Sequence, residues 1–141
     1  MRRNGLPMTT ASSNRDRLLV PGVSPRQLGG VLLLIALMTA LRLIYAGAID
    51  LRTDEAYYWT WSKEGVLSFL DHPPMIAWFI RFGTAIFGDT TLGVRLGGIV
   101  AMFVTQLLLA DIVRRITRDW RAVVLAVLLP EAAVYYGLLM A

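Results

Sequence analysis

The feature that most constrains this chain is a long apolar run from Leu28 to Ile49, 22 residues with Arg42 as the single charge. As a helix, such a run extends about 33 Å, which is enough to cross the hydrocarbon core of a bilayer. Only 17% of the 141 residues are charged and 56% are hydrophobic, which is more apolar than an ordinary soluble domain. The sequence therefore predicts an all-α membrane protein.

Two further apolar runs follow. The second predicted span, Leu92 to Val113, contains fifteen uncharged residues between Leu96 and Ala110. The third, Ala122 to Ala141, has twenty residues and is interrupted near its middle by Pro130-Glu131. The segment between the first two spans, residues 50–91, is too long for a bare connection, so we expect it to have structure and function.

The charges alternate by segment. Residues 1–27 carry a net +4, residues 50–91 carry −3 and residues 114–121 carry +3, which is the positive-inside pattern of a multi-spanning membrane protein. We therefore predict a disordered basic cytoplasmic tail at 1–27, a transmembrane domain at 28–141, an inside N-terminus and an outer loop at 50–91. Nucleic acid is not expected as a partner, in spite of a sequence pI of about 10.0.

A cleaved secretory signal is the alternative for the first run. Ala46-Gly47-Ala48 has the small-x-small pattern of a cleavage site after an apolar region. The length of the run, the internal Arg42 and the later spans all favour an uncleaved anchor. A secreted product cut after Ala48 would leave the later spans unexplained.

The outer loop begins with a helix signal. Thr53 can cap a helix that starts with Asp54 and Glu55, whose carboxylates suit the positive end of a helix dipole. Four of the next residues are aromatic, which is typical of a helix at the level of the lipid headgroups. They are Tyr57, Tyr58, Trp59 and Trp61.

A second start signal is Asp71-His72-Pro73-Pro74, in which Pro takes the first helical position. The run that it opens, Met75 to Phe87, has thirteen residues and is too short to span. We expect it to lie along the membrane surface or among other helices. Further on, Gly93 and Gly97 have the GxxxG spacing, which we interpret as a packing surface.

Asp54 and Glu55 adjoin the end of the first span, where a carboxylate can act as general base toward a hydroxyl nucleophile. A capped first helical turn explains the same pair equally well. Because the two residues are adjacent on a helix, their side chains point about 100° apart. One of them can therefore act on a substrate while the other holds the fold.

Asp71 and His72, the one histidine, could bind a phosphate or a sugar, although an Asp-capped turn is the favoured alternative. A single histidine cannot build a usual zinc site, and the chain has no nucleotide-binding loop and no catalytic triad. Arg95 could meet a lipid phosphate or reach the headgroups. Arg42 and Glu131 lie deeper, where a charge faces protein or a water path, and a pairing that serves only assembly is an equal alternative.

The outer motifs occur in a characteristic order and spacing, and with them the chain resembles the start of a bacterial membrane glycosyltransferase of family 39, in the protein O-mannosyltransferase superfamily with the GT-C fold. The resemblance covers about residues 28–141. It rests on four motifs: Asp54-Glu55-Ala56-Tyr57-Tyr58-Trp59, Asp71-His72-Pro73-Pro74-Met75-Ile76-Ala77-Trp78, Phe87-Gly88-Asp89 and Gly93-Val94-Arg95-Leu96.

The resemblance implies transfer of a sugar from a polyprenyl-phosphate carrier to an acceptor hydroxyl of a glycan, lipid or protein, on the outer face of the bacterial cytoplasmic membrane. Asp54 would be the catalytic base and Glu55 its acidic neighbour. His72 and Arg95 would lie near the carrier phosphate, with Asp71 and Tyr58 also on the substrate. The resemblance implies no cofactor, and it leaves metal dependence and the identity of the sugar open.

Family members are several hundred residues long, with around a dozen spans and a second acidic motif just after the third span. This chain ends at Ala141, where that motif would begin, so we expect an N-terminal part that carries half of an active site and is inactive alone. The alternative is a small membrane protein without catalysis, such as an assembly partner or a decayed paralogue.

Overall fold

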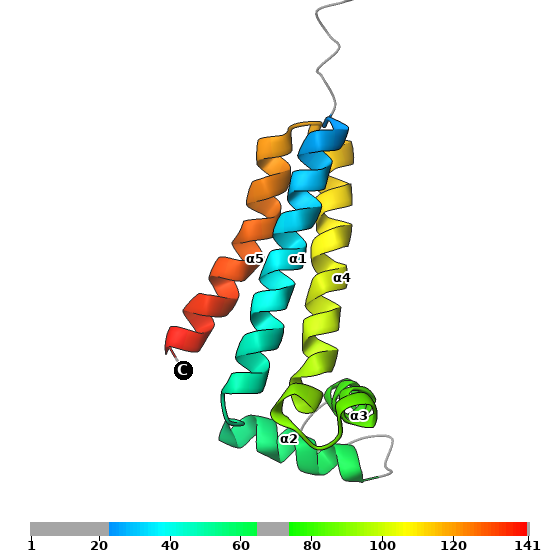
Figure 1. Ribbon diagram of the computed structural model, residues 1–141, viewed down its shortest axis with the longest axis vertical. Coiled ribbons are helices and arrows are strands. Elements are labelled where there is room, and N and C mark those ends of the chain that lie inside the picture. Colours follow the sequence, from blue (N-terminus) through cyan, green and yellow to red (C-terminus); the bar gives the residue numbers. More distant parts are fainter. Residues whose placement is uncertain (1–22, 65–73, 141) are drawn as a thin grey trace, which may run out of the picture.

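The computed structural model describes residues 23–64 and 74–140, and these residues form five helices and no strand. The three long helices α1, α4 and α5 run side by side, while α2 and α3 lie across one end of the bundle (Figure 1). The predicted all-α fold with short helices between the first two spans is therefore confirmed. The bounds are α1 Pro25–Ala48, α2 Thr53–Lys63, α3 Met75–Phe87, α4 Thr91–Thr117 and α5 Trp120–Met140.

Helix α1 begins before the predicted span. Ser24 is its N-cap: the Ser24 hydroxyl accepts a hydrogen bond from the Gln27 backbone N–H at 3.3 Å, and the Gln27 side chain accepts one from the Ser24 N–H at 2.9 Å. This reciprocal capping box, with Pro25 in the first turn, fixes the start of the helix. Residues 25–27 thus belong to α1, and the prediction of a disordered tail up to residue 27 was wrong for them.

Helix α4 is longer than the predicted span of residues 92–113. It continues through Arg114 and Arg115 to Thr117, and its C-cap Arg118 adopts a left-handed conformation with φ 53°. Asp111 holds the last turns, since its carboxylate pairs with Arg114 at 2.5 Å and with Arg115 at 2.7 Å. These neighbours at three and four residues, and the favourable site for cations at a helix C-terminus, extend the helix into what the charges had suggested was a loop.

Helix α5 continues through Pro130, so the interruption predicted at Pro130-Glu131 is absent. Proline is tolerated inside a membrane helix where neighbouring helices and local adjustments satisfy the freed carbonyl. The helices α1, α4 and α5 pack around a small apolar core. Its buried members are Val31, Ile35, Ala110, Val123 and Val127.

The outside of the bundle is apolar as well. Large side chains such as Leu33, Ile44 and Ile116 are 61%, 69% and 76% exposed, which suits a surface covered by lipid rather than water. Among the described residues, α1 and α4 are long and apolar enough to cross a membrane, while α3 is shorter. The third crossing, by the 21 residues of α5, stays a prediction.

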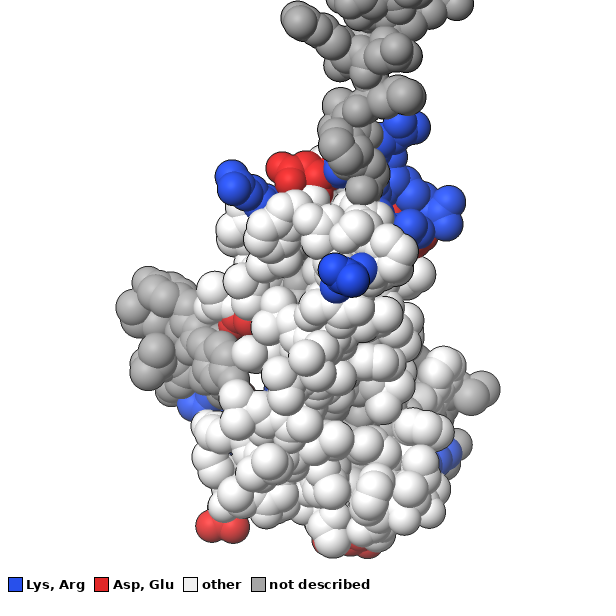
Figure 2. All heavy atoms as spheres, turned by 45° about the horizontal axis from the view of Figure 1, so that its top comes forward, with Lys and Arg blue, Asp and Glu red and all other residues white. Residues whose placement is uncertain are grey.

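Basic side chains gather at the end of the bundle where α1 begins and α4 passes into α5. In Figure 2 acidic side chains lie among the basic ones at this end, and most of the face below is uncharged, with a few acidic and basic groups toward the opposite end. The residues at the basic end are Arg26, Arg114, Arg115, Arg118 and Arg121. The charge separation that the sequence predicted is therefore present along the bundle.

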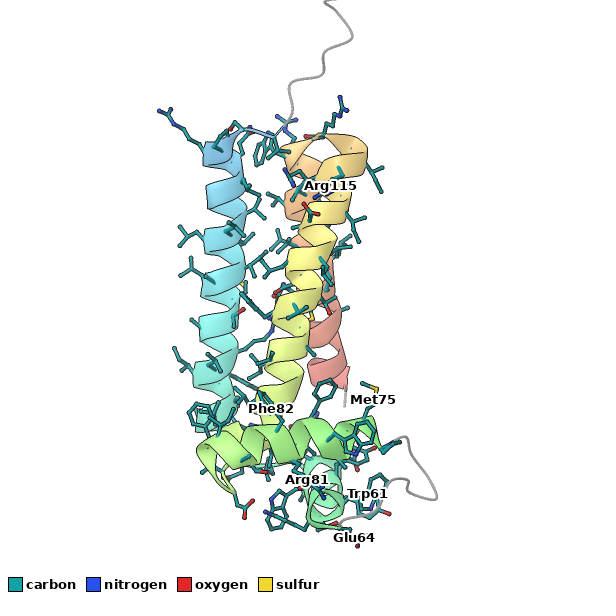
Figure 3. The ribbon with its side chains drawn as sticks, turned by 90° about the vertical axis from the view of Figure 1, so that its right-hand side faces the viewer. Trp61, Glu64, Met75, Arg81, Phe82 and Arg115 are labelled. Atoms are coloured by element: carbon teal, nitrogen blue, oxygen red, sulfur yellow. The ribbon has the colours of Figure 1, made fainter. Side chains whose placement is uncertain are left out.

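Helix α3 crosses α4 in backbone contact (Figure 3). A Cβ added to Gly83 of α3 would lie 2.0 Å from the Gly93 carbonyl oxygen, and one added to Gly97 would lie 2.6 Å from Phe79. No side chain larger than hydrogen fits at these crossing points. The prediction that Gly93 and Gly97 form a packing surface is thus confirmed, and α3 lies among other helices.

Two predicted helix starts are displaced by one residue. Thr53 is the first residue of α2, with Arg52 as the N-cap, so Thr53 does not cap the helix. The Glu55 carboxylate instead accepts a hydrogen bond from the Arg52 backbone N–H at 2.9 Å and satisfies that end. Pro74 is the N-cap of α3 rather than its first helical residue. The predicted cap at Asp71 lies outside the described residues.

Candidate active site

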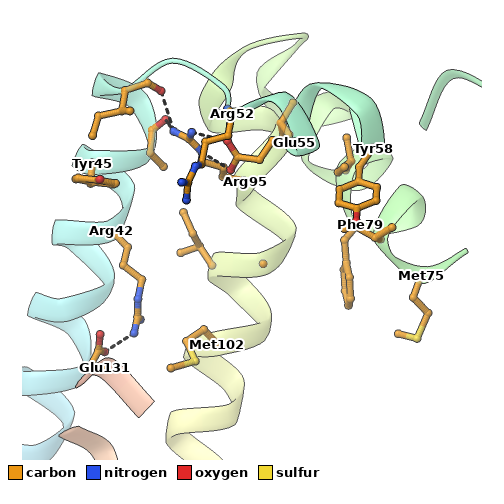
Figure 4. Close-up of a pocket in the computed structure, with 17 residues that line it drawn as sticks. Arg42, Tyr45, Arg52, Glu55, Tyr58, Met75, Phe79, Arg95, Met102 and Glu131 are labelled. Atoms are coloured by element: carbon orange, nitrogen blue, oxygen red, sulfur yellow. Dashed lines mark hydrogen bonds and ion pairs between the residues drawn. The ribbon is translucent and has the colours of Figure 1, made fainter. Parts of the chain in front are cut away.

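A cavity of about 1010 Å³ opens between α1, α4 and the two crossing helices. Its walls are mostly apolar, and charged groups stand at two levels (Figure 4). We call Arg52, Glu55 and Arg95 the rim cluster, and Arg42, Gln106 and Glu131 the deep cluster. All of these residues line the cavity except Gln106, which lies directly behind Glu131.

Glu55 and Arg95 form a two-pronged ion pair at the rim. The Arg95 Nε donates to one carboxylate oxygen at 2.8 Å and the terminal nitrogen Nη2 donates to the other at 2.6 Å. This pair joins the first turn of α2 to α4. The side chains are 15% and 30% exposed for Arg95 and Glu55, so solvent screens the pair only in part.

Arg95 also holds the end of α1. Its Nη1 donates to the carbonyls of Ala46 and Ile49 at 3.0 and 2.8 Å, and its Nη2 donates to the Asp50 carbonyl at 2.9 Å. These carbonyls lie at or beyond a helix C-terminus, where the backbone has no intrahelical partner. An arginine has five N–H donors, and the two contacts with Glu55 and the three carbonyls use all of them. Arg95 therefore has no donor left for a ligand.

The environment of Glu55 keeps it ionised. Partial burial by itself raises the pKa of its carboxyl group, but the hydrogen bonds from Arg95 and from the Arg52 backbone, with the charge of both arginines, lower that pKa below its usual value of 4.5. Both carboxylate oxygens of Glu55 thus accept hydrogen bonds that stabilise the helix start. The arrangement leaves Glu55 without the free basic oxygen that proton transfer requires.

Asp54, the adjacent carboxylate, is in the opposite situation. It is exposed and makes no hydrogen bond or ion pair with any described residue. It does not line the cavity, although its helix turn is anchored to the rim through Glu55. The two acids thus differ as their 100° separation on the helix allows, since Glu55 is engaged in the fold and Asp54 is open to solvent.

Of the other predicted site residues, Tyr58 lines the cavity and Asp71 and His72 lie outside the described residues. Tyr58 is half-buried and packs edge-on against the buried Trp61, with 5.2 Å between ring centroids. Within the described ranges, no three acidic, histidine or cysteine side chains come together as a metal site would require. The structure therefore brings Tyr58, Glu55 and Arg95 to one cavity and leaves Asp54 beside it.

The deep cluster joins three helices inside the bundle. Glu131 of α5 pairs with Arg42 of α1, and its Oε1 also accepts a hydrogen bond from the Gln106 amide of α4 at 2.6 Å. The same amide donates to the Val127 carbonyl at 3.3 Å, and the Gln106 oxygen accepts from Arg42 at 3.4 Å. The sequence had singled out Arg42 and Glu131 separately, and their pairing is a finding of the structure.

Two further contacts hold the crossing helices in place. Arg81 of α3 donates to the carbonyls of Ser62 and Glu64 at the end of α2, at 3.1 and 2.7 Å. Asp89 accepts hydrogen bonds from Lys63 and from the Trp59 indole, and these bonds lower the pKa of Asp89. Both ends of α2 are therefore tied to α3 and α4.

Sequence reasoning did not single out Gln106 and Arg52. Gln106 is fully buried, and the available signal was its position as the lone amide in an otherwise uncharged run of α4. Arg52 lines the cavity beside the acidic pair. Its signal was a cation two residues before Asp54, where α2 begins.

The described residues thus form an apolar helical bundle whose cavity has mostly apolar walls and charged groups at two levels. The profile of the family described as dolichyl-phosphate-mannose-protein mannosyltransferase matches residues 71–141. The chain belongs to this family of membrane glycosyltransferases, whose fold is of the GT-C type. The family resemblance inferred from the outer motifs is thereby confirmed.

A shorter stretch is similar to a curated relative, the lipid A galacturonosyltransferase RgtD of Rhizobium johnstonii. The two are 44% identical over 45 residues, which is 32% of this chain and 10% of the relative. The match thus spans about a tenth of the relative's length. No solved structure matches this chain.

Proposed function

We propose that this chain takes part in transferring a sugar from a polyprenyl-phosphate carrier to an acceptor hydroxyl at the outer face of the bacterial cytoplasmic membrane. Family membership supports a glycosyltransferase. The cavity supports a substrate that is part apolar and part charged, since apolar walls separate a charged rim from a polar interior. No nucleotide cofactor enters the proposal.

The observation that carries the mechanism is the contrast between Asp54 and Glu55. Asp54 is exposed and unpartnered among the described residues, at the first turn of a helix that the Glu55–Arg95 pair fixes beside the cavity. A general base needs a free carboxylate oxygen within reach of the nucleophile, on a rigid support. We therefore assign the base to Asp54 and a positioning role to Glu55.

The proposed reaction is a single displacement. Asp54 takes the proton of the acceptor hydroxyl as its oxygen attacks the anomeric carbon, and the bond to the carrier phosphate breaks with inversion. A phosphate leaves without being protonated, so one base suffices where a glycosidase needs an acid and a base. Cations near the departing phosphate would stabilise the charge that develops on it.

Arg95 acts on that phosphate indirectly in this proposal. All five of its donors are engaged, so it would contribute positive charge and a fixed rim rather than a hydrogen bond. Arg52, exposed on the same rim, is the better candidate for direct contact, together with His72. Asp71 and Tyr58 complete the proposed substrate site.

The orientation is part of the proposal. We place the arginine-rich end of the bundle in the cytoplasm and α2 and α3 outside, with α1, α4 and α5 as crossings, in keeping with the positive-inside rule. The acceptor is a hydroxyl of a lipid-linked glycan or a protein. The name of the relative, a lipid A galacturonosyltransferase, favours the glycolipid acceptor.

The test is Asp54→Asn in a restored full-length transferase that contains this chain, assayed in membranes with radiolabelled polyprenyl-phosphate hexose. Asn cannot take a proton at neutral pH, and it is tolerated at helix starts much as Asp is. We expect turnover to fall about 10²- to 10⁴-fold, the usual effect of a general base, with carrier binding unchanged. Glu64→Gln, an exposed acid at the other end of the same helix region, is the matched control. Near-normal turnover of Asp54→Asn would refute this assignment.

A further inference from the structure

The deep cluster holds one oxygen that the fold does not use. Glu131 is 4% exposed, and its Oε2 atom is buried without a hydrogen-bond partner among the described residues. A buried carboxylate oxygen without a donor is costly, so native structures rarely leave one empty. Glu131 also lines the cavity, so the unused oxygen belongs to a residue of the cavity wall and lies just beneath its surface.

Donors stand next to this acceptor. Arg42 lines the same cavity and gives one N–H to Gln106 and one to Glu131. A guanidinium has five N–H donors, and the described contacts of Arg42 use two of them. The deep end of the cavity therefore presents a free acceptor and free donors side by side, on a pair whose charges cancel.

This combination discriminates between ligand chemistries. A phosphate or carboxylate would be repelled by the free oxygen of Glu131, and an ammonium would be repelled by Arg42. A hydroxyl group both donates and accepts, so it can satisfy Glu131 and Arg42 together. The surrounding walls of Ile99, Met102 and Tyr45 can face the apolar side of a sugar ring.

We propose that the Arg42–Glu131 pair is a subsite for a sugar hydroxyl at the deep end of the cavity. The inference rests on the proposed function for the source of the sugar, which is either the carrier-linked hexose or the acceptor glycan. Arg42 lies seven residues before Ile49, whose carbonyl Arg95 holds at the rim, so the two levels are roughly 10 Å apart along α1. A group bound at the rim and a sugar below it can occupy the cavity together.

The substitution Glu131→Gln tests the subsite while keeping the network. Its side-chain oxygen can still accept from Arg42 and Gln106, which forces the amide nitrogen into the position of the free oxygen. The charged acceptor is then replaced by a neutral donor. Asp119→Asn, an exposed acid at the opposite end of the bundle, is the control. Met102→Phe is a second variant, since it narrows the cavity without touching the cluster.

Binding is measured by calorimetry with the 141-residue chain in phosphatidylcholine nanodiscs, so that the readout does not depend on turnover. The probes are polyprenyl-phosphate hexose, polyprenyl phosphate without sugar, and methyl β-glucoside. The wild type should bind at least one of the two sugar-bearing probes. We expect Glu131→Gln to lower the affinity for that probe about tenfold, which is the difference between a charged and a neutral hydrogen bond. Met102→Phe should lower it as well, and affinity for the sugar-free carrier should stay constant.

The three probes distinguish the donor sugar from the acceptor glycan as the group bound at the subsite. A loss seen with carrier-linked hexose assigns the subsite to the donor sugar, and a loss seen only with methyl β-glucoside assigns it to the acceptor glycan. If neither carrier binds, this chain does not hold the carrier site of the proposed function, and the methyl β-glucoside arm decides the inference by itself. Unchanged sugar affinities in Glu131→Gln would overturn the subsite. They would mean that the Arg42–Glu131 pair only joins helices or binds water.

Discussion

Two arginines of this bundle, Arg95 at the rim and Arg42 at the deep level, face the same cavity and pair with a glutamate, yet they are used differently. Arg95 spends all five donors on Glu55 and on three carbonyls around the end of α1. Arg42 spends two, on Gln106 and Glu131. A charged side chain in such a bundle is therefore not by itself a sign of function. The number of unused donors distinguishes an arginine that only holds helices together from one that has donors free for a ligand.

The two glutamates differ in the same way. Both oxygens of Glu55 accept hydrogen bonds, whereas Glu131 accepts through Oε1 alone. The saturated pair lies where several backbone carbonyls at a helix end need donors. The unsaturated pair lies between continuous helices, where the described backbone acceptor, the Val127 carbonyl, is served by Gln106 rather than by Arg42. Whether an arginine of an ion pair keeps free donors thus depends on how many unpaired backbone carbonyls lie near it.

Lysine substitutions at the two arginines should give the largest difference in stability. Lysine has three donors at a single point, so Arg95→Lys must lose at least two of five hydrogen bonds, which we expect to lower the free energy of unfolding by about 2 kcal/mol. Arg42→Lys can keep both of its contacts and should lose less than about 1 kcal/mol. Unfolding in mixed micelles by increasing dodecyl sulfate measures both. Equal losses would show that the donor count does not matter.

Gln106→Leu sharpens the deep side of the comparison. The buried amide links Arg42, Val127 and Glu131, and a leucine of similar volume removes these links without a cavity. Hydrogen bonds inside membrane bundles contribute about 0.6 kcal/mol each on average, so for three bonds we expect a loss of about 2 kcal/mol in the same assay. Thr105→Leu, exposed on the same helix, is the control, and an equal effect there would contradict the prediction.

Acid should weaken the Glu55–Arg95 pair, and we expect this to be the smallest of the three effects on stability. The pKa of Glu55 is lowered in the folded chain, so its contribution to stability is complete above the ordinary value of 4.5 and is lost as pH falls through the lower, folded value. We expect α2 to loosen as the pH falls below 4.5, followed by the fluorescence of Trp61 in a Trp59→Phe background, because Trp59 also bonds Asp89. Glu55→Gln should remove this dependence. A transition of the same size in Glu55→Gln would assign it to another group.

Much of the architecture could be predicted from the sequence, because apolar runs and charge alternation are local signals. The apolar run from Met75 to Phe87 was predicted and coincides with α3, although Pro74 is its N-cap rather than its first helical residue. The end of α4 was missed because Arg114 and Arg115 indicate a loop by charge, whereas their pairing with Asp111 extends the helix.

The candidate site could be predicted less well. The motif indicated Asp54, Glu55, Tyr58 and Arg95, and the structure brings the last three to one cavity. Which carboxylate is free could not be predicted, since it depends on Arg95, forty residues away from Glu55. The deep cluster joins residues 64 and 89 positions apart. Pairings at that range follow from helix packing, which no local pattern encodes.

The glycine contacts and Arg95 occupy one short stretch of α4, from Gly93 to Gly97, and this has a consequence for biogenesis. Its glycines form the crossing point with α3, and its Arg95 binds the end of α1 and the first turn of α2. All three of those helices precede it in the chain, so during synthesis they emerge before the surface that arranges them exists. The crossing helices can therefore take their final places only after the Gly93–Gly97 stretch of α4 has been synthesised.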